Sequence, residues 1–123
     1  MALFQIVNQN RKCVKKTLVV LVVLSISIAG CTIDPEWERV GTDEFEDAII
    51  NNPTGFLLDV RTTSEWNSDG YIEGATLIPH DSLEDRSDEL PEDMDDLILL
   101  YCRSGNRSQK AAQTLMDMGY TNL

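Results

Sequence analysis

Short apolar runs recur along the second half of the chain, and their lengths are typical of buried β-strands. Three of them contain five or six residues with few polar interruptions: 56–60, 75–79 and 96–101. A run without regular alternation of apolar and polar residues suits a strand that is covered on both faces of a parallel sheet. A shorter first strand is expected over 37–40. The pattern therefore predicts a parallel sheet.

Amphipathic segments between these runs predict helices. The first is expected over 42–51, where Thr42 can cap the helix and apolar residues at 45, 48 and 49 share one face. A short helix is expected over 82–90 and a longer one over 108–118, which Gly119 ends. Strands alternating with helices predict an α/β fold, a twisted parallel sheet flanked by helices with right-handed crossovers. Sites in such sheets lie at the carboxyl ends of strands.

A fourth apolar run, Thr17 to Ala29, differs from the others because a basic segment precedes it and a cysteine follows it. Its 13 uncharged residues fall short of the roughly 20 that a membrane-spanning helix needs. Basic residues, a short apolar run and then small residues predict a signal peptide over 1–30. The alternative is an uncleaved, short membrane anchor. Both predict a domain outside the cytoplasm.

The residues that close this segment, Ile28-Ala29-Gly30-Cys31, resemble the lipobox of bacterial lipoproteins. In that family the cysteine thiol is lipidated and the peptide is cut before it, so the resemblance implies that Cys31 is the lipidated first residue of the mature protein. Buried acyl chains would anchor it stably. The expected location is the periplasmic face of a bacterial membrane, or the cell surface of a Gram-positive cell. Residues 31–39 are then a linker and 40–123 a single domain.

The charge of the chain excludes one class of partner. Residues 1–30 carry 4 of the 10 basic residues and no acid, so the rest holds 6 bases and all 21 acids, a formal net charge of −15. Such a surface repels phosphate backbones, and nucleic acid is not an expected partner. The 3 cysteines lack metal-ligand spacing and there is a single histidine, His80, so neither a metal nor another cofactor is expected.

The segment after the last predicted strand carries the candidate chemistry. Cys102 stands where that strand ends, and Gly105 allows the chain to turn sharply into a helix. Amides of such a turn and of the helix start form a nest for an anion, and Arg103 and Arg107 add positive charge. A thiolate there would have a lowered pKa and act as a nucleophile. The alternative is an inert cysteine buried at a strand end.

Three motifs in order resemble the rhodanese domains, also called single-domain thiosulfate sulfurtransferases. The first is Leu57-Leu58-Asp59-Val60-Arg61 with Glu65 and Trp66, and the second runs from Gly70 to Pro79, with Tyr71 where histidine is frequent. The third is the active-site loop Cys102-Arg103-Ser104-Gly105-Asn106-Arg107-Ser108. That family usually continues beyond 123 with a strand, a turn and a final helix. The domain is therefore expected to lack the usual C-terminal helix.

The resemblance implies an enzyme that moves a sulfane sulfur from thiosulfate or a similar anionic donor to a thiol or cyanide acceptor. Cys102 would carry the sulfur as a persulfide, and residues 103–108 would bind the substrate. Asp59 and Arg61 are expected to support the loop, either directly or as a structural clasp that includes Glu65. His80 is expected to be an ordinary loop residue. A protein partner cannot be read from the sequence.

Two other function classes stay open at this point. Cysteine-based phosphatases and arsenate reductases use a similar loop, but with one residue more between cysteine and arginine than the four that separate Cys102 from Arg107. The tighter ring favours a sulfur atom over a phosphate. A non-catalytic sulfur carrier or a protein-binding module with the same fold is the second alternative.

Overall fold

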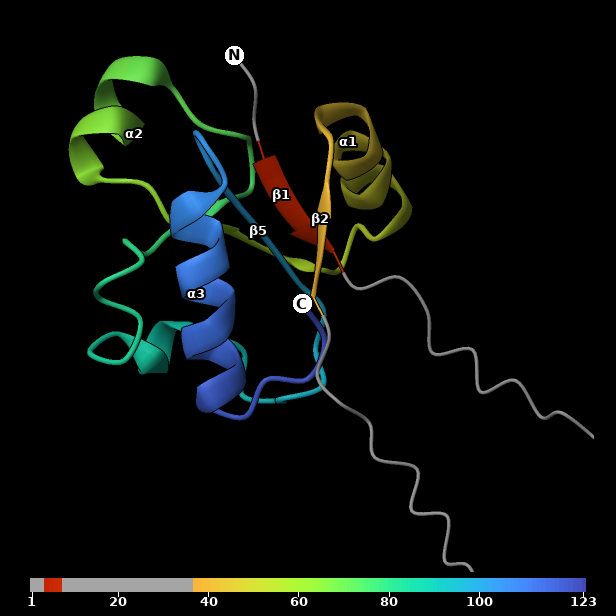
Figure 1. The fold of residues 1–123 in the computed structure, drawn as a ribbon, viewed down its shortest axis with the longest axis vertical. Helices are drawn as coiled ribbons and strands as arrows, with labels where there is room; N and C mark the ends of the chain where they lie inside the picture. The colour runs from red at the N-terminus through yellow and green to blue at the C-terminus, as the bar shows by residue number, and fades with distance from the viewer. Residues whose placement is uncertain (1–3, 8–36) are drawn as a thin grey trace, which may run out of the picture.

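The computed structural model describes residues 4–7 and 37–123. Its strands are β1 Phe4–Val7, β2 Glu38–Val40, β3 Phe56–Asp59, β4 Thr76–Leu77 and β5 Ile98–Cys102. Its helices are α1 Thr42–Asn51, α2 Thr63–Asp69 and α3 Asn106–Asp117, with a 3-10 turn η1 at Ser87–Glu89 (Figure 1). Together they form the predicted α/β domain.

The strands form one sheet in the order β2-β1-β5-β3-β4. The three strands β5, β3 and β4 run parallel, and Leu58 of β3 lies opposite Leu100 of β5. Strand β1 pairs antiparallel with both β5 and β2. The predicted parallel sheet is thus confirmed for the strands that carry the long apolar runs.

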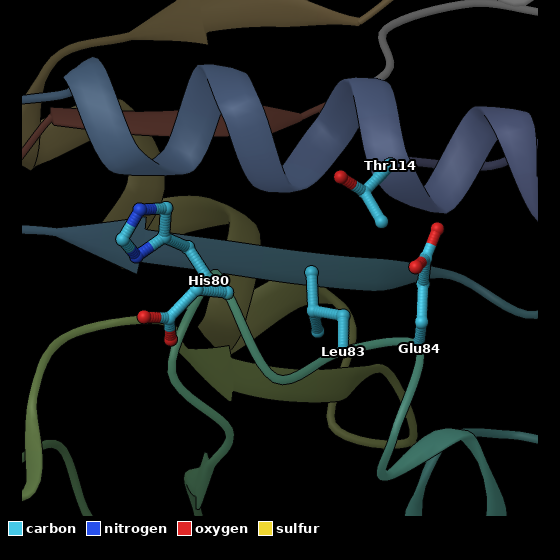
Figure 2. A pocket seen from close by; sticks show the side chains of 5 residues that line it. His80, Leu83, Glu84 and Thr114 are labelled. Carbon is cyan, nitrogen blue, oxygen red and sulfur yellow. The ribbon is translucent and has the colours of Figure 1, made fainter.

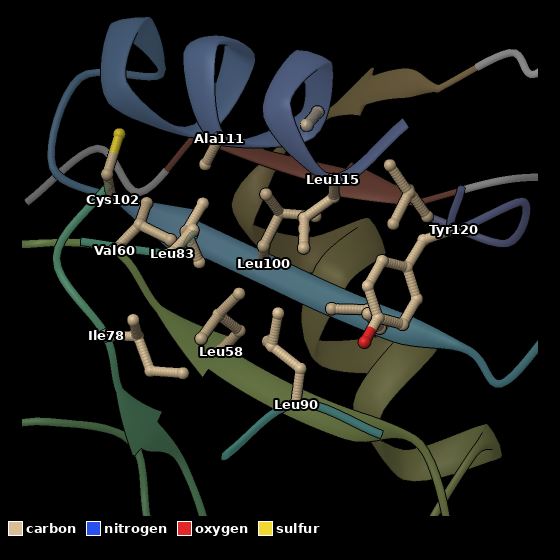
Figure 3. Close-up of a cluster of buried hydrophobic side chains, with 13 residues drawn as sticks. Leu58, Val60, Ile78, Leu83, Leu90, Leu100, Cys102, Ala111, Leu115 and Tyr120 are labelled. Atoms are coloured by element: carbon tan, nitrogen blue, oxygen red, sulfur yellow. The ribbon is translucent and has the colours of Figure 1, made fainter. Parts of the chain in front are cut away.

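Side chains of β3 and β5 alternate between two apolar clusters, one on each face of the sheet. Leu57, Leu99 and Tyr101 pack toward α1, around its buried Phe45. Their neighbours Leu58, Leu100 and Cys102 pack on the other face against α3 (Figure 3). Helix α3 contributes Ala111, Ala112 and Leu115 to that face. Both faces are covered, which explains why these runs do not alternate.

Several predicted boundaries differ from the observed ones. The predicted cap residue Thr42 is instead the first residue of helix α1. Gly41 occupies the cap position, and its N–H donates to Glu44 Oε2 at 2.9 Å. Helix α3 begins at Asn106, two residues before the predicted start at 108. Gly119 follows its end with φ +107°, the left-handed conformation that closes a helix.

The helix predicted over 82–90 is wrong, because only the short turn η1 forms there. Acidic residues recur in this segment at the i,i+4 spacing, Glu84 with Asp88 and Asp85 with Glu89, and like charges at that spacing destabilise a helix. Leu83 and Leu90 are buried, so the segment is attached to the core even though no helix forms.

The predicted signal peptide overlaps the described residues only at Phe4–Val7, which pair as strand β1. The rest of that segment and Cys31 lie outside the described residues, so the signal peptide and the lipidation stay predictions. Within the described ranges, no helix is long and apolar enough to cross a membrane.

Candidate active site

Cys102 is the last residue of β5 and has no solvent-exposed surface. It lies at the end of the apolar cluster between the sheet and α3, near Val60 and Leu83 (Figure 3). The strand has ended there, so the sulfur lies beside the loop that leads into α3. Cys102 is a free cysteine. Burial alone would fit the inert alternative, and its polar neighbours decide between the two.

Backbone amides of the loop and of the start of α3 point at the sulfur of Cys102. The N–H of Gly105 donates to Sγ at 3.1 Å and that of Ser108 at 3.4 Å. Gly105 has φ +84° and is the cap residue of α3, and Ser108 is in the first turn. Amides at a helix start have no partner within the helix, so they are available to an anion. The predicted nest therefore forms around this sulfur.

The hydroxyl of Ser108 completes the surroundings of the thiol. Its Oγ lies 3.5 Å from Sγ of Cys102 and donates to the carbonyl of Gly105 at 3.0 Å. Burial raises the pKa of the Cys102 thiol, but hydrogen bonds from Ser108, Ser104 and Gly105 outweigh it. The pKa is lowered, because these donors stabilise the thiolate. The polar neighbours are those of a reactive thiol.

The predicted role of Arg107 in substrate binding requires a guanidinium that is free to contact an anion, but this guanidinium is already paired. Its guanidinium makes a two-point contact with Glu65 of α2, with Nη1–Oε2 at 2.5 Å and Nη2–Oε1 at 2.8 Å. Glu65 also accepts from the Thr62 backbone and hydroxyl, and its N–H returns a bond to that hydroxyl. The contact ties the start of α3 to the start of α2. Because Glu65 neutralises part of its charge, Arg107 raises the positive potential near Cys102 less than an unpaired arginine would.

The other predicted loop residues lie mainly at the surface. Arg103, Ser104 and Asn106 are exposed. Arg103 Nη1 is 4.0 Å from Asp69 Oδ2 at the end of α2. The Ser104 carbonyl accepts from Arg39 of β2 at 3.2 Å, which links the loop to the sheet edge. Of these side chains, Arg103 is the one that carries charge to the surface directly beside the cysteine.

Asp59 and Arg61 form a buried pair at the end of β3. Arg61 Nε donates to both carboxylate oxygens of Asp59, at 3.0 and 2.9 Å, and Nη2 donates to Oδ2 at 2.6 Å. Nη2 also donates to the Gly70 carbonyl at 2.7 Å. The predicted clasp between Arg61 and Glu65 is wrong, because Asp59 holds Arg61 and Arg107 holds Glu65. The pair fixes the backbone after β3 and the residue after α2.

A separate pocket lies between the 80–84 loop and α3 (Figure 2). It is lined by His80, Asp81, Leu83, Glu84 and Thr114. None of the residues that hydrogen-bond to the cysteine sulfur lines it. The His80 amide donates to the Val60 carbonyl at 3.2 Å, a structural contact. No cluster of three or more metal-ligating side chains occurs in the part of the chain that the structure describes.

Helix α2 brings residues to the site that the sequence reasoning did not place there. Glu65 and Asp69 are one helical turn apart, and each faces an arginine of the loop. The helix itself was not predicted, because none of its residues is buried. A signal existed in Thr62 and Glu65, whose spacing is that of a capping box, and both reciprocal bonds of that box form.

Comparisons with known proteins agree with these features. Residues 41–123 match the family model described as a rhodanese-like domain. A sulfurtransferase of Allochromatium vinosum is 32% identical over 82 residues, which cover 67% of this chain and 74% of that protein. The thiosulfate sulfurtransferase PspE of Escherichia coli is 30% identical over 66 residues, 54% of this chain and 62% of PspE.

Two further relatives are longer than this chain. The putative sulfur carrier protein YrkF of Bacillus subtilis is 32% identical over 82 residues, 67% of this chain but only 43% of YrkF. Among solved structures, reduced Bacillus anthracis CoADR-RHD is 41% identical with a TM-score of 0.52, covering 61% of this chain and 13% of that one. In both of these relatives the similar region is therefore less than half of the protein.

Proposed function

Because the chain belongs to the rhodanese-like domain family, we propose that it is a sulfurtransferase that carries a sulfane sulfur on Cys102. The observation that supports this most directly is the convergence of the Gly105 and Ser108 amides on one sulfur atom, at 3.1 and 3.4 Å. These donors are fixed by the start of α3, so they stabilise negative charge without rearranging. The relatives named as sulfurtransferases support the same reaction class.

The proposed reaction has two displacement steps at sulfur. The Cys102 thiolate attacks the outer sulfur of thiosulfate, the bond between the two donor sulfurs breaks, and sulfite leaves with the electron pair. The product is the Cys102 persulfide anion. Cyanide or a thiolate then attacks the terminal sulfur, and the Cys102 thiolate leaves. The lowered thiol pKa supplies the nucleophile, so the first step needs no general base.

The burial of Cys102 limits what can react with it. The side chain has no exposed surface, and the amides already lie within hydrogen-bonding distance of its sulfur. A terminal sulfur is a single atom that can approach through the loop and share these donors after transfer. A tetrahedral phosphate is larger, which supports sulfur transfer over the phosphatase alternative.

The test is an intact-mass measurement on the full chain in mild detergent, before and after incubation with thiosulfate. We expect a gain of one sulfur atom, located on Cys102 by peptide mapping and removed by cyanide. The Cys102→Ser variant should gain nothing there. A folded wild-type protein that never gains sulfur at Cys102 from thiosulfate or another sulfane donor would overturn the enzyme proposal and favour the protein-binding alternative.

We also propose that the domain is lipid-anchored outside the cytoplasm through Cys31. The supporting pattern is the basic segment, the apolar run from Thr17 to Ala29 and the cysteine after two small residues. The test is the mass of the N-terminal peptide after expression in a bacterium, compared with a Cys31→Ser variant. We expect a peptide that begins at Cys31, with a diacylglyceryl group on the Cys31 thiol and an acylated amino terminus, and an intact N-terminus would contradict the proposal. Cleavage before Cys31 would remove β1, so the same measurement decides whether β1 belongs to the mature sheet.

A further inference from the structure

Three arginines near the active-site loop contact α2 or the Gly70 cap that follows it, and two of them are fully compensated. Arg61 is held by Asp59 through three bonds of 2.6 to 3.0 Å. Arg107 is held by Glu65 through two bonds, at 2.5 and 2.8 Å. A guanidinium in a two-point contact presents little net charge to a third group. These two arginines therefore add little to the attraction of an anionic donor.

The third arginine, Arg103, is only loosely compensated. It follows Cys102 directly in the chain, and its side chain is 60% exposed. Its Nη1 lies 4.0 Å from Asp69 Oδ2, at the limit of an ion pair and too far for a hydrogen bond. The other oxygen of Asp69, Oδ1, accepts from the Ser68 hydroxyl at 2.8 Å. Asp69 thus faces Arg103 without being locked to it.

The position of Asp69 is unfavourable for the helix that carries it. Asp69 is the last residue of α2, and the last turn of α2 contains no basic residue. The carboxyl end of a helix carries partial negative charge, so a carboxylate there is destabilising unless a cation compensates it. An acid at this position therefore does not serve the stability of α2. The proximity of Asp69 to Arg103 explains the acid instead.

We propose that Asp69 is a specificity-determining residue that sets the charge of the preferred sulfur donor. This rests on the proposed sulfurtransferase function. A doubly charged donor that approaches Arg103 meets the Asp69 carboxylate at the same place, whereas a singly charged donor meets half of that repulsion. Asp69 thereby offsets the attraction of Arg103 and reduces the preference for the thiosulfate dianion over donors that carry one negative charge.

Thiosulfate and methanethiosulfonate form a matched pair of donors for testing this. In both, the Cys102 thiolate attacks the terminal sulfur and the sulfur–sulfur bond breaks. Sulfite leaves from the first and methanesulfinate from the second, each with the electron pair, and the persulfide product is the same. The donors differ in one unit of charge, a methyl group replacing one charged oxygen. The ratio of their loading rates therefore reports charge selectivity and cancels changes in the reactivity of the thiol.

The experiment measures Cys102 loading from each donor by intact mass, with the full chain in mild detergent. In Asp69→Asn, loading from thiosulfate relative to methanethiosulfonate should rise about three- to tenfold at low salt, because one repulsive charge near the dianion is removed. The increase should be smaller in roughly 0.5 M salt, because salt at that concentration strongly screens exposed charges. Asp47→Asn is the control, since it removes an exposed acid of α1 on the other face of the sheet.

The outcomes separate this inference from the function on which it rests. Loading from both donors with a ratio that Asp69→Asn leaves unchanged would overturn the role of Asp69 and leave the sulfurtransferase intact. An equal change in Asp47→Asn would also overturn it, because net charge alone would then explain the effect. Loading from neither donor in any folded variant would overturn the proposed function, and the inference with it.

Discussion

Two arginine–carboxylate pairs at the carboxyl edge of the sheet are similar in geometry but differ in their surroundings. The side chains of Asp59 and Arg61 are 0% and 5% exposed, whereas those of Glu65 and Arg107 are 20% and 23% exposed. The first pair lies within two residues of one strand end and also binds the Gly70 carbonyl. The second joins two helices across 42 residues of sequence. We therefore expect the buried pair to contribute mainly to the stability of the fold, and the more exposed pair to influence the pKa of the Cys102 thiol.

Breaking the buried pair should have the largest effect. In Arg61→Met the carboxylate of Asp59 loses its partner inside the protein, and breaking such a pair costs about 3–5 kcal/mol of unfolding free energy. Urea unfolding followed by circular dichroism measures the change. The control is Glu89→Gln, which breaks the solvent-exposed pair between Glu89 and Arg86 and should change stability far less, because water screens that pair. Equal losses in the two variants would mean that burial does not distinguish the pairs.

The same contrast explains how much of the fold the sequence predicts. The runs that became β3 and β5 and the helices α1 and α3 bury apolar side chains, and their patterns were readable. Helix α2 buries none and has only its capping box as a local signal. The helix predicted over 82–90 does not form, because its acidic residues repel each other at helical spacing. Leu83 and Leu90 are buried there without a helix.

For the site, the sequence predicts the groups that belong to one continuous segment and not the groups that meet across the fold. The amides of Gly105 and Ser108 reach Cys102 because a strand must turn into a helix within three residues. The partner of Arg107 is on another helix, and no local pattern specifies Glu65 rather than a substrate. Long-range ion pairs depend on the packing of complete elements, so they appear only in the structure.

The more exposed pair should change the thiol in opposite directions, depending on which partner is removed. Arg107→Gln removes a positive charge near the thiolate and leaves the Glu65 carboxylate uncompensated, so the Cys102 pKa should rise. Glu65→Gln leaves the guanidinium uncompensated and should lower that pKa. The measurement is the pH dependence of Cys102 alkylation by iodoacetamide, in which the thiolate is the reactive form. Shifts of the same sign in both variants would indicate a loosened loop instead of a charge effect.

The smallest effect expected is that of the Ser108 hydroxyl, which touches the sulfur without being charged. Ser108→Ala keeps the Ser108 amide but loses the hydroxyl contact with the sulfur at 3.5 Å and the hydroxyl bond to the Gly105 carbonyl at 3.0 Å. The Cys102 pKa should therefore rise, but by less than in Arg107→Gln. The same alkylation profile measures it. Thr114→Ala is the control, since its hydroxyl bonds the Lys110 carbonyl on the same helix. A rise as large as that of Arg107→Gln would show that the hydroxyl positions the amides, and that the backbone nest depends on this side chain.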